Sequence, residues 1–330
     1  MAPLPRAALL FFLFAGVCFG LGYPTLNRYD PRLSGGNSDA RYYYDMAAGQ
    51  APATTGHWRY RVLVPLVARP FCRLAAGRFH TWDPALFGLL CANSLFCAAS
   101  LLVLTLLAGS ILGDERAGLL CALLYALDFS VANSQLAGLV DSAEALFLLL
   151  GMWIARRGAW AWLPVLAVFG APAKETIIPL STALLVGWRL GDADREKGPW
   201  LWIAAYAVVG LVCVSLVRWA VAGGWSAPWD IASSERAGET LFHGLRAALF
   251  SKGFLYTFAW LLPLGVWRLG RLPRPWVWGS CAAGAAAGLL GAWNGSGDNA
   301  ARPLFCAVGP MLCASVALLF FEKTKDSAPS

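Results

Sequence analysis

Hydrophobic stretches long enough to cross a bilayer alternate with short polar segments along almost the whole chain. A transmembrane helix needs about 20 apolar residues. Ten candidate spans result, at residues 7–24, 85–112, 117–134, 137–155, 158–171, 177–190, 199–222, 253–270, 276–293 and 303–321. The fifth and sixth are short, which favours tilted helices or a break at the Ala-Pro-Ala segment between them. The pattern predicts an all-α polytopic membrane protein in which residues 1–330 form a single transmembrane domain.

Composition supports lipid as the solvent of this chain. Of its 330 residues, 58% are hydrophobic and 14% are charged, and the mean hydropathy is +0.57. Soluble domains carry about a quarter charged residues. The net charge of +7 does not indicate nucleic acid, because the basic residues alternate with the spans and form no separate basic domain. Anionic lipid headgroups or a phosphorylated lipid are the better partners.

Basic residues in the short loops predict the orientation. Every second loop is basic, and these loops together with the two ends hold Arg6, Arg116, Arg156, Arg157, Arg189, Arg195, Lys197, Arg268, Arg271, Arg274, Lys323 and Lys325. The opposite short loops hold only Lys174 and Arg302. We therefore expect both termini, including the tail at 322–330, to be cytoplasmic. A signal peptide with Arg6 before an apolar core at 8–19 is the alternative, but no clear small-x-small cleavage site follows it.

Two long segments are predicted outside the cytoplasm. The first covers about 25–84 and contains eight arginines, on a loop of a length at which the charge rule weakens. The second covers about 223–252 and combines tryptophans with charged residues of both signs. The abundance of Ala, Gly, Leu, Arg and Trp is typical of a GC-rich bacterial genome, which predicts a bacterial inner membrane with the periplasm on this side.

A short helix is predicted at 35–49 in the first outer loop. Asp39 lies in its first turn, Gly49 can end it, and Tyr42 shares the face of Asp39, while Asp45 falls on a neighbouring face. A carboxylate beside tyrosines suits a site that binds a sugar ring and removes a hydroxyl proton. An interfacial helix with Asp39 as a capping charge explains the same pattern.

The segment that follows alternates aromatic and basic residues. It reads Trp58, Arg59, Tyr60, Arg61 and continues into a second amphipathic stretch that is expected to end near Arg78. Arginine forks match phosphate oxygens, and aromatic neighbours exclude water from them. An interfacial helix that extends its arginines to headgroups is the alternative. The compact alternation favours phosphate binding.

Ionisable residues also lie near the outer ends of the spans. They are Asp128, Asp141, Glu144, Lys174 and Glu175. A single intramembrane charge commonly pairs with another and fixes helix packing. Because several such charges converge on one side, the sequence predicts a water-filled outer cavity.

The last outer loop carries another pair of opposite charges. Asp298 and Arg302 are four residues apart, and Pro303 enters the final span. A local surface ion pair, which contributes little to stability, is the alternative. Asn294-Gly-Ser matches a glycosylation sequon, which we interpret as a chance match.

Metal and nucleotide sites are not indicated. Eight of the nine cysteines fall inside apolar runs, only Cys72 falls in a predicted loop, and no CxxC pair occurs. His57, His80 and His243 are scattered without ligand spacing. No Gly-rich loop follows a strand, which argues against a nucleotide-sugar donor on a Rossmann-type domain.

The order of these motifs resembles a known family. Asp-x-x-Tyr-Tyr-x-x-Met-Ala starts at Asp39, Tyr-Arg-Val-Leu-Val-Pro at Tyr60, Lys-Glu-Thr at Lys174 and Asp-x-x-x-Arg-Pro at Asp298, and Asp141 opens a span between the second and the third. Together, from about 5 to 321, they resemble GT-C fold glycosyltransferases of the bacterial dolichyl-phosphate-mannose and lipid-sugar-dependent type.

The resemblance implies a polyprenyl-phosphate-linked sugar as donor and an acidic catalytic residue in the first outer loop. Asp39 would be the catalytic base, with Asp45 as the second candidate, and Tyr42 and Tyr43 would contact the substrate. The implied phosphate ligands are Arg59, Arg61, Lys174 and Arg302. The implied residues that line or brace the site are Asp141, Glu175 and Asp298.

Two departures from the family narrow the expectation. The first loop has no Asp-Glu or Asp-x-Asp pair, so a divalent metal is unsupported. The chain ends soon after the last span, so a small or lipid-linked acceptor is expected. The sequence thus predicts a membrane glycosyltransferase acting on an acceptor hydroxyl at the extracytoplasmic face. A transporter or flippase of an anionic lipid-linked substrate and a non-catalytic membrane subunit are the alternatives.

Overall fold

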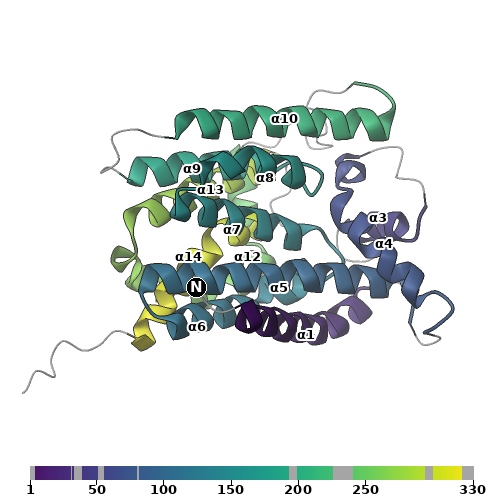
Figure 1. Ribbon diagram of the computed structural model, residues 1–330, viewed down its shortest axis with the longest axis horizontal. Coiled ribbons are helices and arrows are strands. Elements are labelled where there is room, and N and C mark those ends of the chain that lie inside the picture. The colour runs from purple at the N-terminus through teal and green to yellow at the C-terminus, as the bar shows by residue number, and fades with distance from the viewer. Residues whose placement is uncertain are drawn as a thin grey trace, which may run out of the picture.

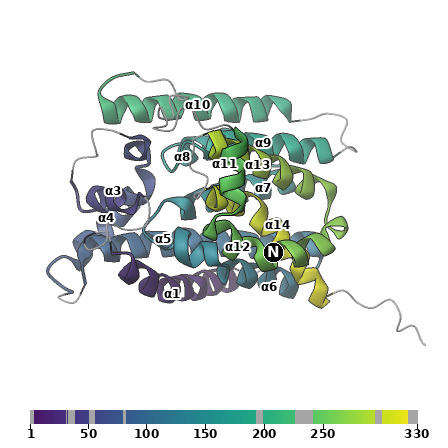
Figure 2. The same cartoon turned by 180° about the vertical axis from the view of Figure 1, so that it is seen from behind.

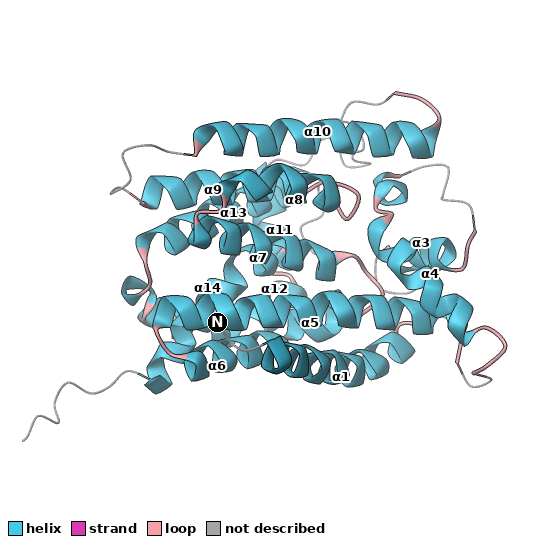
Figure 3. Cartoon of the chain, viewed as in Figure 1, coloured by secondary structure: helices cyan, strands magenta, loops and turns pink. Residues whose placement is uncertain are grey.

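The regular elements are all helices in the part of the chain that the computed structural model describes, residues 4–30, 32, 39–50, 56–79, 82–192, 199–225, 241–293 and 300–321 (Figures 1 and 3). The helices are α1 (Leu4–Arg28), α3 (Ala40–Ala47), η1 (His57–Tyr60), α4 (Leu63–Ala75), α5 (Pro84–Leu112), α6 (Glu115–Ala126), the π-helix η2 (Val131–Gln135), α7 (Asp141–Arg157), η3 (Trp160–Trp162), α8 (Leu163–Gly170), α9 (Ile177–Gly191), α10 (Trp200–Ala222), α11 (Leu241–Leu249), α12 (Lys252–Trp267), η4 (Leu269–Arg271), α13 (Arg274–Trp293) and α14 (Ala301–Phe321). The all-α prediction is confirmed for these residues.

Several helices are long and apolar enough to cross a membrane. Four satisfy both conditions alone, at Pro5–Arg28, Pro84–Leu112, Trp200–Ala222 and Ala301–Phe321. The pair Phe242–Leu249 and Lys252–Trp267, bent by 66°, makes a fifth if it is one span. The chain therefore has the helices of a multi-pass membrane protein. All ten predicted stretches fall largely on helix, but ten spans remain a prediction.

Local signals explain where the longest helix begins and ends. Asp83 precedes α5, and one of its carboxylate oxygens accepts hydrogen bonds from the backbone N–H groups of Ala85 and Leu86, each at 2.9 Å. Pro84 occupies the first turn, where it needs no hydrogen-bond partner. Gly113 ends the helix in the left-handed conformation, with φ of 72°.

Most helices run side by side along the long axis of the molecule. In Figure 1, α10 forms the upper edge and α1 and α6 form the lower edge. The beginning of α1 and the end of α14 lie toward one end of the bundle, and α3 and α4 lie at the other (Figures 1 and 2). Helix α11 crosses the back of the bundle (Figure 2). The end that carries α3 and α4 is called the α3–α4 end below.

Glycines let some of these helices approach closely. A Cβ at Gly187 of α9 would lie 2.5 Å from the carbonyl oxygen of Trp278 in α13, and one at Gly118 of α6 would lie 2.4 Å from that of Thr105 in α5. Such contacts are typical of helix packing in membranes, where small residues let backbones meet.

Large apolar side chains lie on the outer surface of the bundle. Leu201 and Trp267, for example, are about three-quarters exposed (76% and 75%).

The structure differs from the sequence-based expectation in the first outer loop. Asp39 directly precedes α3 and is not part of its first turn, although Gly49 does follow the helix with φ of 88°. Cys72, expected in a loop, is buried in α4. The amphipathic pattern after Arg61 explains this, since it forms α4 against α5 and buries one face of that helix.

The stretch predicted at 117–134 is also interrupted. Helix α6 stops at Ala126, and the chain continues through a turn into η2. Asp128 lies in this break, where its carboxylate accepts a hydrogen bond from the backbone N–H of Ser130 at 2.8 Å. A buried carboxylate that bonds its own backbone competes with helical hydrogen bonding, which accounts for the interruption.

Candidate functional site

Charged side chains from five separate parts of the chain meet inside the α3–α4 end of the bundle. They come from the residue before α3, the residue after η1, the loop between α8 and α9, the first turn of α7 and the first turn of α14. We call them the ion network; its members are Asp39, Arg61, Asp141, Glu144, Lys174, Glu175 and Arg302.

Arg61 is the centre of the first half of the network. Its Nε and Nη2 donate to the two carboxylate oxygens of Glu175 at 3.0 and 2.6 Å, which is a bidentate pair. Its Nη1 lies 3.1 Å from the Tyr43 hydroxyl and 3.4 Å from an oxygen of Asp39. Arg61 is thus held on three sides and has a defined orientation.

Lys174 is the centre of the second half. Its Nζ donates to Asp141 at 2.7 Å and to Glu144 at 2.6 Å. The second oxygen of Asp141 accepts from Nη1 of Arg302 at 3.1 Å, and the second oxygen of Glu144 accepts from the Thr176 hydroxyl at 2.5 Å. Each carboxylate therefore bridges two donors.

The two halves form one continuous unit because Lys174 and Glu175 are neighbours in sequence. The unit holds three cations and four carboxylates, in alternation. Buried charges are tolerated in a low-dielectric interior only when they are paired and hydrogen-bonded, and removing one partner leaves its neighbour uncompensated. The burial of each charged side chain in the network is thus tolerated only while its partners are present.

Backbone contacts hold the loop that carries Lys174 and Glu175. The N–H of Leu63, at the start of α4, donates to the carbonyl of Pro172 at 3.0 Å, which joins the first outer segment to the α8–α9 loop. The N–H of Ala173 donates to the carbonyl of Gly170 at 3.0 Å, closing a tight turn after α8. The Ala-Pro-Ala segment therefore forms a turn that delivers two adjacent charges to opposite halves of the network.

The network shifts the pKa values of its loop residues. Burial alone would raise the pKa of Glu175, but the adjacent Arg61 guanidinium lowers it to about 2. Burial would lower the pKa of Lys174 and of Arg61, yet their carboxylate partners raise both above the ordinary values. Burial, aided by Arg61, lowers the pKa of His57. The ionised forms of Glu175, Lys174 and Arg61 are thus all favoured.

Asp39 is the carboxylate of the network that reaches its surface. Its side chain is 22% exposed, whereas the other three carboxylate side chains are 6% exposed or less. It makes no side-chain cap to α3 and is directed to Arg61 instead. Asp39 is therefore the network acid best placed to meet a substrate from outside.

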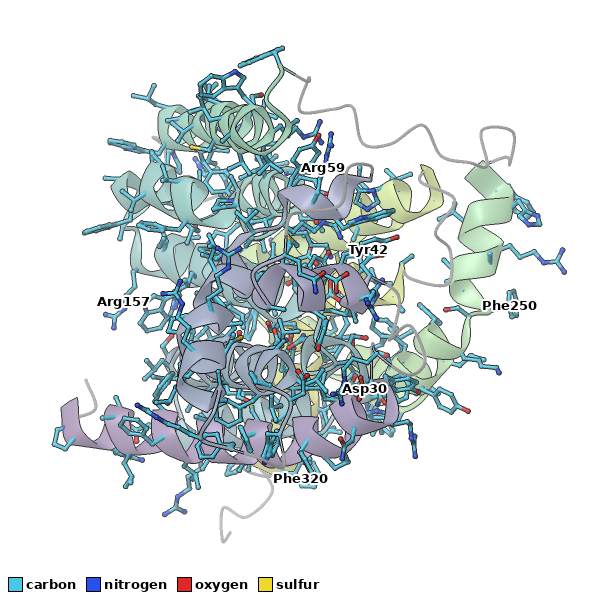
Figure 4. All side chains as sticks on the ribbon, turned by 90° about the vertical axis from the view of Figure 1, so that its right-hand side faces the viewer. Asp30, Tyr42, Arg59, Arg157, Phe250 and Phe320 are labelled. Atoms are coloured by element: carbon cyan, nitrogen blue, oxygen red, sulfur yellow. The ribbon has the colours of Figure 1, made fainter. Side chains whose placement is uncertain are left out.

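Aromatic residues of α3 and η1 adjoin Arg61, whose backbone N–H donates to the carbonyl of Trp58 at 3.1 Å. The rings of Tyr42 and Trp58 stack, with centroids 4.5 Å apart and planes 15° apart. Arg59 contacts its neighbour Tyr60, with its guanidinium carbon 4.6 Å from the ring centroid. Figure 4 looks onto this end of the bundle and labels Tyr42 and Arg59, which come from α3 and η1. Stacked rings beside a carboxylate are a surface on which a sugar can bind.

Other predicted site residues lie apart from the network or outside the described residues. Asp45 forms an i, i+4 ion pair with Arg41 at 3.2 Å along α3. Asp298 lies outside the described residues. The network thus contains six of the eleven predicted site residues, namely Asp39, Arg61, Asp141, Lys174, Glu175 and Arg302, and Tyr43 is bonded to it. Tyr42 and Arg59 lie beside it. Their roles stay predictions.

Two residues of this region were not assigned a site role from the sequence. Glu144 is fully buried and binds both Lys174 and Thr176; its position one helical turn after Asp141 was the available signal. Arg218 is 1% exposed in α10, and its guanidinium carbon lies 5.3 Å from the centroid of the Tyr60 ring. It is the single charged residue within the apolar run at 199–222, and such residues usually face a partner or a cavity.

A cavity of about 540 Å³ opens beside Arg302. Its lining comes from the turn before η2, from η2, from the start of α12 and from the first turn of α14. Arg302 belongs to both the cavity wall and the network, so the network has one edge that a ligand in the cavity can contact. Among the described residues, no group of three or more His, Cys, Asp or Glu side chains is placed to hold a metal ion.

Comparison with protein-family models, with curated proteins and with solved structures finds no match to this chain. The family resemblance stated above therefore depends on the motifs and on their order alone.

Proposed function

We propose that this protein is a membrane glycosyltransferase. It moves a sugar from a polyprenyl-phosphate-type lipid to an acceptor hydroxyl at the α3–α4 end of the bundle, on the extracytoplasmic side of a bacterial inner membrane. The single observation that supports this most is the ion network, which gathers residues from position 39 to position 302 and leaves one carboxylate, Asp39, partly exposed. A purely structural ion pair would not require so many distant segments at one end of the bundle.

The proposed reaction is an inverting displacement. Asp39 removes the proton of the acceptor hydroxyl, and the oxygen forms a bond to the anomeric carbon of the donor sugar. The bond between that carbon and the phosphate oxygen breaks, and its electron pair leaves with the phosphate. Cations of the site stabilise the phosphate charge, so the protein mainly supplies geometry and electrostatic stabilisation.

Arg61 positions Asp39 in this scheme. Because Glu175 accepts from both Nε and Nη2 along one edge of the guanidinium, Arg61 cannot turn freely, and its Nη1 holds the Asp39 oxygen at 3.4 Å. This contact fixes the position of the Asp39 carboxylate, as a general base that must reach the acceptor hydroxyl requires. The neighbouring stack of Tyr42 on Trp58 would face the sugar.

Two substitutions in the same short helix region test the proposal. Purified, reconstituted protein would be given a polyprenyl-phosphate sugar and an acceptor mixture, and released polyprenyl phosphate would be measured. Asp39→Asn should reduce transfer by about 10²-fold or more, the usual contribution of a general base. Asp45→Asn should retain transfer, because Asp45 pairs only with Arg41 among the contacts described above.

The exposed Arg78, at the same end of the bundle, provides a control for membrane insertion through Arg78→Ala. Full transfer activity of a correctly folded Asp39→Asn protein would show that Asp39 is not the general base. Movement of the lipid across proteoliposomes without any transfer product would support a flippase in place of a transferase.

A further inference from the structure

The cavity beside Arg302 differs in charge from the ion network behind it. Its described lining contains two basic residues, Lys252 and Arg302, and no aspartate or glutamate. The network, by contrast, contains more carboxylates than cations. Among the described lining residues, an anion in the cavity would therefore meet two cations, of which Arg302 also donates to Asp141 of the network at 3.1 Å.

The other cations of the network are poorly placed for an external anion. Arg61 is bonded to both oxygens of Glu175, and Lys174 is bonded to Asp141 and Glu144 at less than 3 Å. Their side chains are only 9% and 8% exposed. An anion that bound them would compete with carboxylates already in contact, which is unfavourable. Arg302 is also bonded to a carboxylate, Asp141, but by a single contact at 3.1 Å, and it is more exposed, at 17%, and lines the cavity.

Lys252 provides the second cation of the cavity lining. It is exposed and is the first residue of α12, where Ser251 accepts a hydrogen bond from the backbone N–H of Phe254 at 3.1 Å. The partial positive charge of a helix N-terminus adds to that of the ammonium group. Lys252 and Arg302 thus approach the cavity from α12 and α14, and these two helices pack against each other.

The remaining wall combines hydroxyl groups with aromatic rings. Ser130, Ser134 and Thr257 are buried and line the cavity. Phe250, which is 74% exposed at the junction of α11 and α12, lies at the side of the molecule in Figure 4. Hydroxyl groups suit phosphate and sugar oxygens, and an exposed ring at the edge suits a hydrocarbon chain.

We infer that this cavity binds the phosphate group of a lipid-linked phosphate, with Lys252 and Arg302 as its two cations. The inference deepens the proposed function and rests on it for the identity of the lipid carrier. Lys252 is a new assignment. The inference places the phosphate of the donor beside α12 and α14, and not at Arg59 and Arg61. The donor would then enter between these helices and the turn before η2, while the acceptor would approach Asp39.

Direct binding tests the inference without any transfer reaction. The full-length protein in nanodiscs would be titrated with a short-chain polyprenyl phosphate, with the matched neutral polyprenol and with inorganic phosphate. Lys252→Gln and Arg302→Gln should each raise the Kd for polyprenyl phosphate by about tenfold or more, the scale of one charge-assisted contact. Arg78→Gln, which removes an exposed charge at the same end, should leave this Kd unchanged.

Lys252→Gln is the decisive variant, because Lys252 is exposed and outside the network, so the loss of its charge should not disturb folding. Wild-type affinity in Lys252→Gln, or equal affinity for polyprenol and polyprenyl phosphate, would overturn the inference. Inorganic phosphate that binds as tightly as the lipid would assign the cavity to a soluble phosphate and overturn the lipid form. Tight, Lys252-dependent binding without sugar transfer would uphold the site while the proposed transferase activity fails.

Discussion

At the scale of single residues, the pairing of buried opposite charges determines how much a substitution in the ion network destabilises the protein. Glu175 and Arg61 have side chains only 6% and 9% exposed and are joined by two hydrogen bonds. Most of their stabilising effect is the avoidance of an unpaired buried charge, because desolvation of two ions offsets much of their attraction. Removing one partner should therefore be far more harmful than removing an exposed pair.

Glu175→Gln tests this directly. The substitution leaves the Arg61 guanidinium buried without its bidentate partner, and the free energy of unfolding should fall by about 3–5 kcal/mol. Arg41→Ala, which breaks the more exposed pair with Asp45, should change it by about 1 kcal/mol or less. Unfolding in mixed detergent measures both. Equal effects of the two substitutions would contradict the network account.

Glu175 also predicts a dependence of stability on pH. Its pKa in the folded protein is lowered to about 2 from an ordinary value of 4.5, so the unfolded chain binds a proton more readily. The contribution of ionised Glu175 is complete above about pH 4.5 and is lost as the pH falls toward 2.

Unfolding of the wild type and of Glu175→Gln between pH 7 and pH 3 would measure this contribution. The stability difference between the two proteins should be constant down to about pH 5 and should shrink below it. A difference that stayed constant down to pH 3 would mean that Glu175 is not held ionised by Arg61.

The sequence predicted which residues belong to the candidate site better than it predicted which of them form ion pairs. The outer-loop acid, the Tyr60–Pro65 motif and Lys174-Glu175 were all identified as candidates from the sequence, and the structure brings them together. The pairing itself was not predictable, because it depends on the turn at Pro172 that sends Lys174 and Glu175 in different directions. Glu144 received no site role from the sequence, although its position one helical turn after Asp141 in α7 was an available signal.

At the scale of elements, close helix packing places Arg61. Helix α4 packs along α5, and Gly88 of α5 lies where they meet. A Cβ at this position would lie 2.2 Å from the Cys72 sulfur and 2.7 Å from the Ala68 carbonyl oxygen. The second contact is with backbone, so the two helices would have to separate.

Gly88→Ala should consequently destabilise the protein by about 1–3 kcal/mol, the typical effect of overpacking. It should also reduce any activity that depends on Arg61, since η1 and α4 are continuous in the chain. Gly16→Ala in α1 is a matched control, because its Cβ would have no other atom within 4 Å. Thermal unfolding of both variants measures the effect, and equal midpoints would show that α4 is not fixed by this contact.

Helix positions were predicted well from the apolar stretches, but their interruptions were not. The run at 117–134 looks like one span, yet Asp128 bonds the backbone of Ser130, and a π-helix follows. The amphipathic stretch after Arg61 was expected to continue toward Arg78, whereas α4 ends at Ala75. Local hydrogen bonds of this kind compete with helix propagation and leave no clear trace in hydropathy.

At the scale of the whole molecule, the α3–α4 end carries the ion network, and the cavity lies beside Arg302 of that network. The end of α14 lies at the opposite end of the bundle (Figure 1). The distribution of basic residues in short loops predicts that the α3–α4 end is extracytoplasmic. Such an arrangement gives a lipid-linked donor and a periplasmic acceptor access to the same site.

Cysteine labelling tests this orientation. Arg78→Cys, at the α3–α4 end, should react with a membrane-impermeant maleimide in intact cells. Arg157→Cys, at the last residue of α7 and on the predicted cytoplasmic side, should react only after permeabilisation. Both positions are exposed, and the wild type with its nine cysteines sets the background. The reverse pattern would place the network in the cytoplasm and contradict the predicted topology.

The most direct measurement of the central claim is mass spectrometry of the lipids that co-purify with the protein from bacterial membranes. The site proposed here, with a carboxylate at its rim and two cations in the adjoining cavity, predicts enrichment of a polyprenyl-phosphate-linked sugar or its polyprenyl-phosphate product. The enrichment should be lost in Lys252→Gln and kept in Arg78→Gln. Enrichment of only neutral lipids, or equal recovery of the phosphate-bearing lipid from all three proteins, would contradict the account.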